Sequence, residues 1–148
     1  MFGVEINMVV YDSQEAFKLY EKVFEQVDLI EATDFNKGQN EAVFTILGTR
    51  FHLLDENRDF QLIAPQPGDP KPMWINMVVK DIFATFQLAI EAGCAQIQPV
   101  TDLESFGILN AIFMDPFGYI WMLHQIVREV SFEERCRIIT EQMEALKE

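Results

Sequence analysis

The stretch Ile6-Asn-Met-Val-Val-Tyr-Asp12 recurs as Ile75-Asn-Met-Val-Val-Lys-Asp81, 69 residues further along a chain of 148. At the same offset Phe17 matches Phe86 and Phe44 matches Phe113. A unit repeated at a fixed spacing indicates a duplicated fold, and this unit is too long and too few in number for a solenoid. The chain is therefore predicted to be two copies of one small module joined in tandem.

Each copy has the sequence pattern of one strand, one helix and three further strands. The first strand alternates apolar and polar side chains, whereas the helix repeats apolar side chains every three or four positions behind an aspartate N-cap. The elements predicted for the first copy are a strand at 3–11, a helix at 13–25 and strands at 29–33, 42–47 and 50–54. Those predicted for the second are a strand at 73–80, a helix from Asp81 to Ala92 and strands at 95–100, 109–114 and 119–126. The predicted fold class is α+β, with two tandem βαβββ modules.

A proline-rich stretch separates the two copies, because repeated prolines keep the backbone extended and out of helices. The predicted divisions are module one at 1–56, a linker at 57–72, module two at 73–127 and a C-terminal helix at 131–148. Asp115-Pro116-Phe117-Gly118 is a strong turn signal between the last two strands. Ser131 with Glu134 three residues later predicts a capping box at the start of the terminal helix.

The composition indicates an acidic globular protein of the cytoplasm. A hydrophobic content of 49% supports a core, and the net charge of −13 argues against binding to nucleic acid or anionic membranes. Cys94 and Cys136 fit neither a metal motif nor a disulfide framework, so both are expected to be reduced and mostly structural. No secretion signal and no apolar run of membrane-spanning length is recognised.

Paired βαβββ units in a chain of this size resemble the vicinal oxygen chelate superfamily of glyoxalases, extradiol dioxygenases and bleomycin-resistance proteins. Three segments resemble its PhnB-like branch: Ile75–Val79 with Asp81, Asp115–Trp121, and Val130–Glu134. The resemblance covers nearly the whole chain and implies a single glyoxalase-like domain over 1–148. In that fold the modules form a curved, half-open mixed sheet with helices outside and a concave face that holds a metal or ligand. It also implies a homodimer, since half-open sheets leave edges and apolar surface to be covered.

Strand parity predicts which residues face the cavity. Ile6 and Met8 should pack under the first helix, so Glu5 and Asn7 should point the other way. The duplicate places Trp74 and Asn76 inward in the same manner, although the repeated asparagines could instead be inherited packing residues. The predicted ligand-binding residues are Glu5, Asn7, Trp74, Asn76, Met122, His124 and, in a loop at 101–108 that resembles the family's mobile rim loop, Phe106. Trp121 alternates away from Met122 and should lie beneath the helices.

Metal-dependent members of the superfamily take one ligand from the first strand and one from the last strand of each module. Carried over by position, these residues are Glu5, His52, Trp74 and Met122. Tryptophan offers only a donor and methionine is a soft ligand, so Glu5 and His52 are weak metal candidates and no cofactor is expected. His124 could supply a third ligand. The strict offset of 69 matches Leu53 rather than His52 to Met122, which leaves the direction of His52 open.

Three functions are compatible with these residues. The first hypothesis is a metal-independent protein that binds a small, partly apolar organic molecule. The second is a metal-dependent lyase or dioxygenase-like enzyme using Glu5 and His52, with Glu5 as a candidate general base if an apolar cavity raises its pKa. The third is a structural or regulatory dimer with a vestigial cavity. The terminal helix, with an apolar stripe including Ile139 and Met143, could dock on the partner or close its own core.

Overall fold

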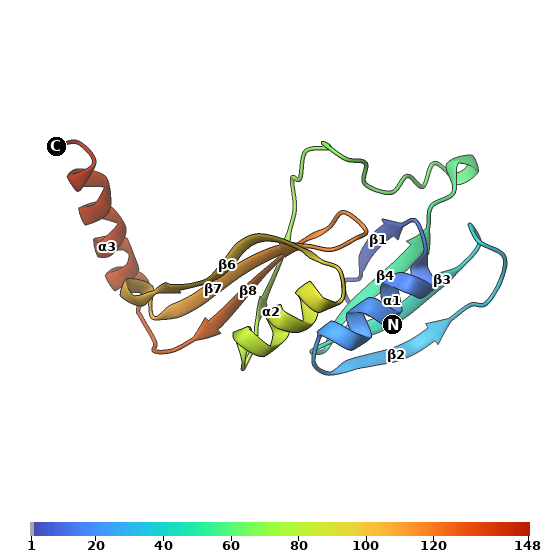
Figure 1. Cartoon of the computed structure of the whole chain (residues 1–148), viewed down its shortest axis with the longest axis horizontal. Coiled ribbons are helices and arrows are strands. Elements are labelled where there is room, and N and C mark those ends of the chain that lie inside the picture. Colours follow the sequence, from blue (N-terminus) through green and yellow to red (C-terminus); the bar gives the residue numbers. More distant parts are fainter. Residues whose placement is uncertain (1) are drawn as a thin grey trace.

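The computed structural model describes residues 2–148 and shows the two predicted modules followed by a helix (Figure 1). Module one contains β1 (Ile6–Val10), α1 (Ser13–Val23), β2 (Val27–Ala32), β3 (Glu41–Ile46) and β4 (Thr49–Asp55). Module two contains β5 (Ile75–Val78), α2 (Ile82–Glu91), β6 (Ala95–Leu103), β7 (Ile108–Met114) and β8 (Ile120–Ile126). Short 3-10 turns occupy Arg58–Phe60 and Glu104–Phe106, and α3 (Phe132–Ala145) ends the chain. The α+β fold with tandem βαβββ modules is confirmed.

Each module forms a four-stranded mixed sheet, in the orders β1-β4-β3-β2 and β5-β8-β7-β6. The first strand of each module runs parallel to the last, and the other pairs are antiparallel. The last strand also caps the helix of its module. Asp55 Oδ1 accepts a hydrogen bond from the Ser13 amide at 2.7 Å, and Gln125 Oε1 accepts one from the Ile82 amide at 2.9 Å. The duplication therefore preserves a long-range N-cap as well as the strand pattern.

The register of the sheets resolves the direction of His52. Asn7 pairs with His52 on β4, and Asn76 pairs with Met122 on β8, so these two partners are 70 residues apart rather than 69. The difference arises between the third and fourth strands of each module. The pair Thr45–Arg50 encloses four residues, whereas the equivalent pair Met114–Ile120 encloses five. His52, and not Leu53, is therefore equivalent to Met122, and Leu53 is buried beneath the helices.

The strand phase is as predicted. Met8 and Met77 are buried in a core that extends through both modules, whereas Asn7 and Asn76 are exposed on the opposite face of their sheets. Trp121 is fully buried, as its alternation with Met122 predicts. In Figure 1, α1 and α2 lie side by side on the same side of the two sheets. The modules thus pack through their helix-covered faces, which leaves the other two faces uncovered.

The Asp115-Pro116-Phe117-Gly118 turn forms as predicted, and it also fastens the two modules together. Tyr20 of α1 donates its hydroxyl proton to Asp115 Oδ2 at 2.5 Å, and the Trp121 indole donates to the same oxygen at 2.9 Å. The Tyr119 hydroxyl donates to the Val9 carbonyl at 2.8 Å. Burial raises the pKa of Tyr20 well above its ordinary value and that of Tyr119 to about 12, so both hydroxyls stay protonated as donors.

The prediction of a rim loop at 101–108 is largely wrong. Residues 101–103 continue β6, where they pair with Asn110, Leu109 and Ile108 of β7, and only Glu104–Phe106 forms a turn. Pro99 lies within this strand because β6 is a sheet edge whose register shifts between Gln98 and Thr101, where the proline stands. Such edges tolerate the missing N–H of proline.

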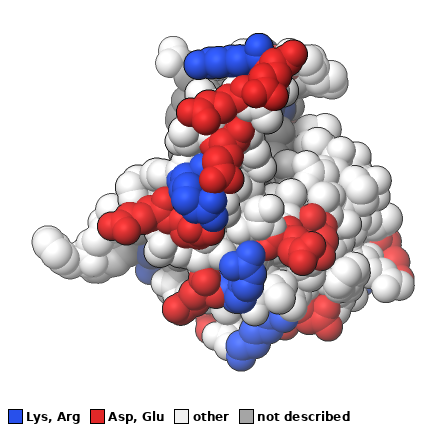
Figure 2. All heavy atoms as spheres, turned by 90° about the vertical axis from the view of Figure 1, so that its left-hand side faces the viewer, with Lys and Arg blue, Asp and Glu red and all other residues white. Residues whose placement is uncertain are grey.

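The terminal helix does not close its own core. Within α3, all of which the structure describes, every residue is exposed or only half-buried. The helix extends from the far end of module two, away from both sheets, in the view of Figure 1, and Figure 2 shows the molecule from that side. Cys136 lies on this helix and is exposed, so only buried Cys94 has the structural role that was expected of both cysteines. Along residues 2–148, no helix combines the length and apolar character needed to cross a membrane.

The capping box at the start of α3 is only half formed. Ser131 Oγ accepts a hydrogen bond from the Glu134 amide at 3.1 Å, as the sequence predicts. The Glu134 carboxylate does not reach back to Ser131; it binds Arg137 one turn further along the helix. An arginine three residues on is a stronger partner for a carboxylate than a backbone amide, which explains the difference.

Candidate functional site

The predicted site residues lie on the two sheet faces that the helices do not cover. Glu5 and Asn7 lie on module one, in line with His52 of β4. Trp74, Asn76, Met122 and His124 lie on module two, where Asn76 pairs with Met122 and Val78 with His124. Phe106 lies at the end of module two nearest α3, in the Glu104–Phe106 turn. Within one chain the two groups therefore belong to separate sheets.

One hollow contains residues from both groups. A cavity of about 400 Å³ lies where β1 meets the start of β5, with the proline-rich linker along one side. Asn7 and Trp74 both line it, together with Tyr119, Lys71 and several apolar side chains. Glu5, Asn76, Met122, His124 and Phe106 do not line this cavity. The cavity thus brings together Asn7 of module one and Trp74 of module two, and the other predicted site residues lie outside it.

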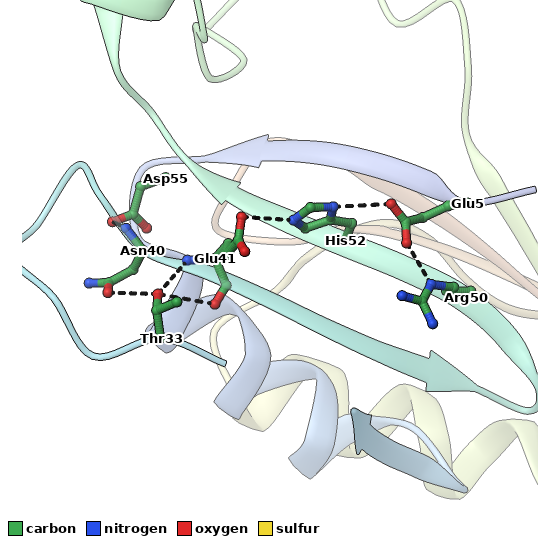
Figure 3. Close-up of polar contacts among 7 residues, drawn as sticks. All are labelled: Glu5, Thr33, Asn40, Glu41, Arg50, His52 and Asp55. Carbon is green, nitrogen blue, oxygen red and sulfur yellow. Dashed lines mark hydrogen bonds and ion pairs between the residues drawn. The ribbon is translucent and has the colours of Figure 1, made fainter. Parts of the chain in front are cut away.

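A chain of four polar side chains crosses the face of module one (Figure 3). Arg50 Nε donates to Glu5 Oε2 at 2.5 Å, and the other oxygen of Glu5 lies 3.0 Å from His52 Nδ1. His52 Nε2 lies 3.2 Å from Glu41 Oε2 on the neighbouring strand. All four side chains are partly buried. Both nitrogens of the His52 ring therefore face carboxylates, and both contacts are hydrogen bonds only when the ring carries two protons.

The hydrogen bond from Arg50 lowers the pKa of Glu5 below its ordinary value, with a further contribution from His52. This direction is opposite to the raised pKa that a general-base role for Glu5 would need. The guanidinium instead holds Glu5 as a carboxylate, in the manner of a charge-assisted pair. The arrangement can present hydrogen-bond donors and acceptors to a ligand.

The residues at the four metal positions do not fit a divalent ion. Glu5 already uses both oxygens and His52 both nitrogens, and the equivalent positions of module two hold Trp74 and Met122. His124 lies on the other sheet, where burial lowers the pKa of its ring. Nowhere in the described part of the chain do three or more His, Cys, Asp or Glu side chains gather as a metal site would require.

The face of module two is mostly apolar. Trp74, Val78 and Ile126 are each more than half exposed, with Met122 partly exposed between them. Within residues 2–148, the side chains of Asn7 and Asn76 form no hydrogen bond with another residue. A polar, charged face in one module is thus matched by an apolar face in the other.

The sequence did not identify Glu41 or Arg50. Arg50 precedes His52 by two residues in one strand, so parity alone could have placed both on the same face. Glu41 pairs with Leu54 across the β3–β4 hairpin, and its approach to His52 depends on that register. No short-range signal in the sequence gives such a register.

Comparisons with known proteins agree with this architecture. No family model matches the sequence. The chain is 30% identical over 131 residues to the uncharacterized protein Mb0911c of Mycobacterium bovis, which covers 86% of each chain. The PhnB protein from Bacillus cereus has a similar structure, with a TM-score of 0.65 at 16% identity, over 84% of this chain and 99% of that one.

The fosfomycin resistance protein FosX from Listeria monocytogenes, solved with Mn(II) and sulfate, has a TM-score of 0.67 at 14% identity, over 94% of this chain and 98% of its own. At such low sequence identities, the structural matches establish the fold and not the function. The duplicated βαβββ modules and the parallel first and last strands of each sheet match those neighbours. The chain therefore has the fold of the PhnB-like and FosX proteins of the vicinal oxygen chelate superfamily, and it belongs to one family with the mycobacterial protein Mb0911c.

Proposed function

We propose that this protein binds a small, partly apolar organic molecule without the help of a divalent metal. The observation that carries the proposal is the chain from Arg50 through Glu5 and His52 to Glu41, which engages the two residues best suited to hold a metal. An ion would have to displace Arg50 from Glu5 and one carboxylate from His52. The other half of the site would then offer only Trp74 and Met122, which are poor ligands for a hard cation.

The side chains available to a ligand have the mixture typical of binding pockets. Trp74 is 54% exposed and offers a large stacking surface. The amides of Asn7 and Asn76 point from equivalent positions on the two sheets and can orient a polar group. Met122 adds an adaptable apolar contact beside Asn76. A ligand with a polar end toward module one and an apolar body toward module two would match both faces.

We further propose that the protein is a homodimer in which module one of one copy faces module two of the other. The exposed surface of the chain is 9614 Å². A compact monomer of this mass would expose about 7,800 Å². The excess of roughly 1,800 Å² exceeds the ~800 Å² per partner of a standard interface and suits an obligate dimer. Because the modules of one chain pack through their helix faces, a second copy is the natural cover for the open faces.

A metal-dependent enzyme is the second candidate, and one observation favours it. Glu5 and His52 share a sheet face and approach within 3.0 Å, as the first two ligands of a metal centre would. In this alternative Arg50 would have to swing away when the metal binds. Elemental analysis of untagged protein, purified without chelator, separates the two candidates, since a stoichiometric divalent metal would refute metal independence.

Ligand binding can be tested with the fluorescent apolar probe 8-anilinonaphthalene-1-sulfonate, with and without EDTA. We expect chelator-independent binding that Trp74→Ala weakens about tenfold, the effect of losing one good aromatic contact. The matched control is Phe83→Ala, because Phe83 is an aromatic residue on α2 that is 61% exposed and lies outside the site. Binding that disappears with EDTA, or that the two variants reduce equally, would contradict the proposal.

A further inference from the structure

Four residues of α3 and its C-cap Leu146 form a narrow stripe that the described part of the chain leaves largely exposed. They occur at alternating spacings of four and three residues: Phe132, Cys136, Ile139, Met143 and Leu146. The exposed fractions are 71% for Phe132, 46% for Ile139, 59% for Met143 and 87% for Leu146. This spacing places all five side chains on one line along the helix, as in the seam that a helix presents to a packing partner.

The opposite face of α3 carries charged side chains that are exposed to solvent. Arg137 pairs with Glu134 at 2.5 Å and with Glu141 at 2.6 Å, one turn away on either side. Figure 2 shows charged side chains of both signs on the projecting helix. Such exposed pairs contribute little to stability, and a lone helix of this length is marginal in water. The stripe therefore needs a partner surface if the helix is to be stable.

The position of the stripe points to the same second copy that would cover the open sheet faces. A hollow of about 550 Å³ joins the base of α3 to module two. Ile108 and Ile126 of the sheet line one side of it, and Val130 and Ser131 at the start of the helix line the other. Arg128, Glu129 and Arg135 also line this hollow, and the stripe itself begins just beyond it at Phe132. The stripe is near the exposed face of module two because β8 ends at Ile126, only a few residues before α3 begins.

We infer that α3 is an arm that packs its apolar stripe onto a second copy of this chain. The inference rests on the proposed homodimer and adds that the helix contributes to its stability. The excess surface of roughly 1,800 Å² per chain leaves room for a helix contact in addition to a standard sheet interface. A membrane or an unrelated protein is a different occupant, and a dimer that leaves Cys136 as reactive as in the monomer would leave the stripe open to one of these.

The test uses the full-length chain with Ile139→Glu on the stripe and Ala145→Glu as the charge-matched control off the stripe. Both residues are exposed in the single chain, so neither substitution disturbs the core. Analytical ultracentrifugation over a concentration series gives the dimer dissociation constant of each variant. We expect Ile139→Glu to weaken the dimer on the order of thirtyfold, as for a buried isoleucine, and Ala145→Glu to change it less than threefold.

A second readout needs no variant. Cys136 lies on the stripe and Cys94 is buried, so a thiol reagent in native buffer reports on Cys136. We expect its modification to slow at least fivefold as the wild-type protein passes from monomer to dimer. A dimer that forms with unchanged Cys136 reactivity, and that both variants leave equally stable, would overturn the arm while the proposed dimer stands. A wild-type chain that stays monomeric at every concentration would overturn both.

Discussion

Replacing Tyr20 with phenylalanine removes one hydroxyl group from the contact that fastens the modules together. That hydroxyl donates to Asp115 Oδ2 at 2.5 Å, and both side chains are buried. Burial raises the pKa of the Asp115 carboxyl, and the hydrogen bonds from Tyr20 and Trp121 oppose that rise. The substitution therefore leaves a buried carboxylate short of one donor while the aromatic ring and its packing stay in place.

A hydrogen bond to a charged group contributes about 1.5–3 kcal/mol. Because Asp115 keeps the indole of Trp121 and two backbone amides of its own turn, we expect Tyr20→Phe to cost about 2 kcal/mol of unfolding free energy. In a chain of this size the loss corresponds to a melting temperature lower by roughly 5 °C.

Urea unfolding, followed by tryptophan fluorescence at one fixed protein concentration, measures the difference, since Trp121 is buried in the folded chain. Tyr11→Phe is the matched control, because Tyr11 is exposed and its hydroxyl makes no hydrogen bond with residues 2–148 in the structure. We expect the control to change stability by less than about 0.5 kcal/mol. Equal losses in the two variants would refute the role assigned to the Tyr20–Asp115 contact.

Three further predictions concern stability. Met77→Ala should cost about 3 kcal/mol in urea unfolding because Met77 is buried, whereas Trp74→Ala should cost less than about 1 kcal/mol because Trp74 is largely exposed; the reverse order would contradict the strand phase. Gly118→Ala should lower the melting temperature, since Gly118 has φ 94° and a Cβ there would lie 2.8 Å from the Cβ of Pro65; an unchanged melting temperature would show that the linker yields freely. Burial alone would raise the pKa of the Asp55 carboxyl, but the hydrogen bonds from Ser13 and nearby backbone amides outweigh burial and hold this pKa below its ordinary value in the folded state. Folding thus favours its ionised form, so the stability lost in Asp55→Asn should be full above about pH 5 and should shrink as the pH falls through the folded pKa; a pH-independent difference would contradict this.

Local patterns were enough to predict the modules, the strand phase and the burial of Trp121. Each depends on the alternation or helical spacing of side chains within about a dozen residues. The features that sequence reasoning missed depend on register between strands. One more residue lies between Met114 and Ile120 than between the equivalent residues Thr45 and Arg50, which makes His52 rather than Leu53 equivalent to Met122, and only the paired strands reveal it.

The same limit applies to the candidate site. Glu5 and His52 were found by position, but their partners Arg50 and Glu41 decide what they can do. An arginine two residues from His52 is visible in the sequence, whereas its choice of Glu5 requires the parallel pairing of β1 with β4. The predicted gathering of Glu5, Asn7, Trp74, Asn76 and Met122 in one cavity stays a prediction that depends on assembly of a second copy.

The contact between Tyr20 and Asp115 also has a consequence for dividing the chain into two separate polypeptides. The hydrogen bonds from Tyr20 to Asp115 and from Tyr119 to Val9 join the modules directly and involve no residue of the proline-rich linker. These contacts between the modules therefore do not depend on the covalent linker. Two fragments divided near Gly68, in the exposed part of the linker, retain every one of these donors and acceptors and are suited to reassemble from separate polypeptides. These two hydrogen bonds would therefore survive a change in the exposed part of the connector and keep the halves together.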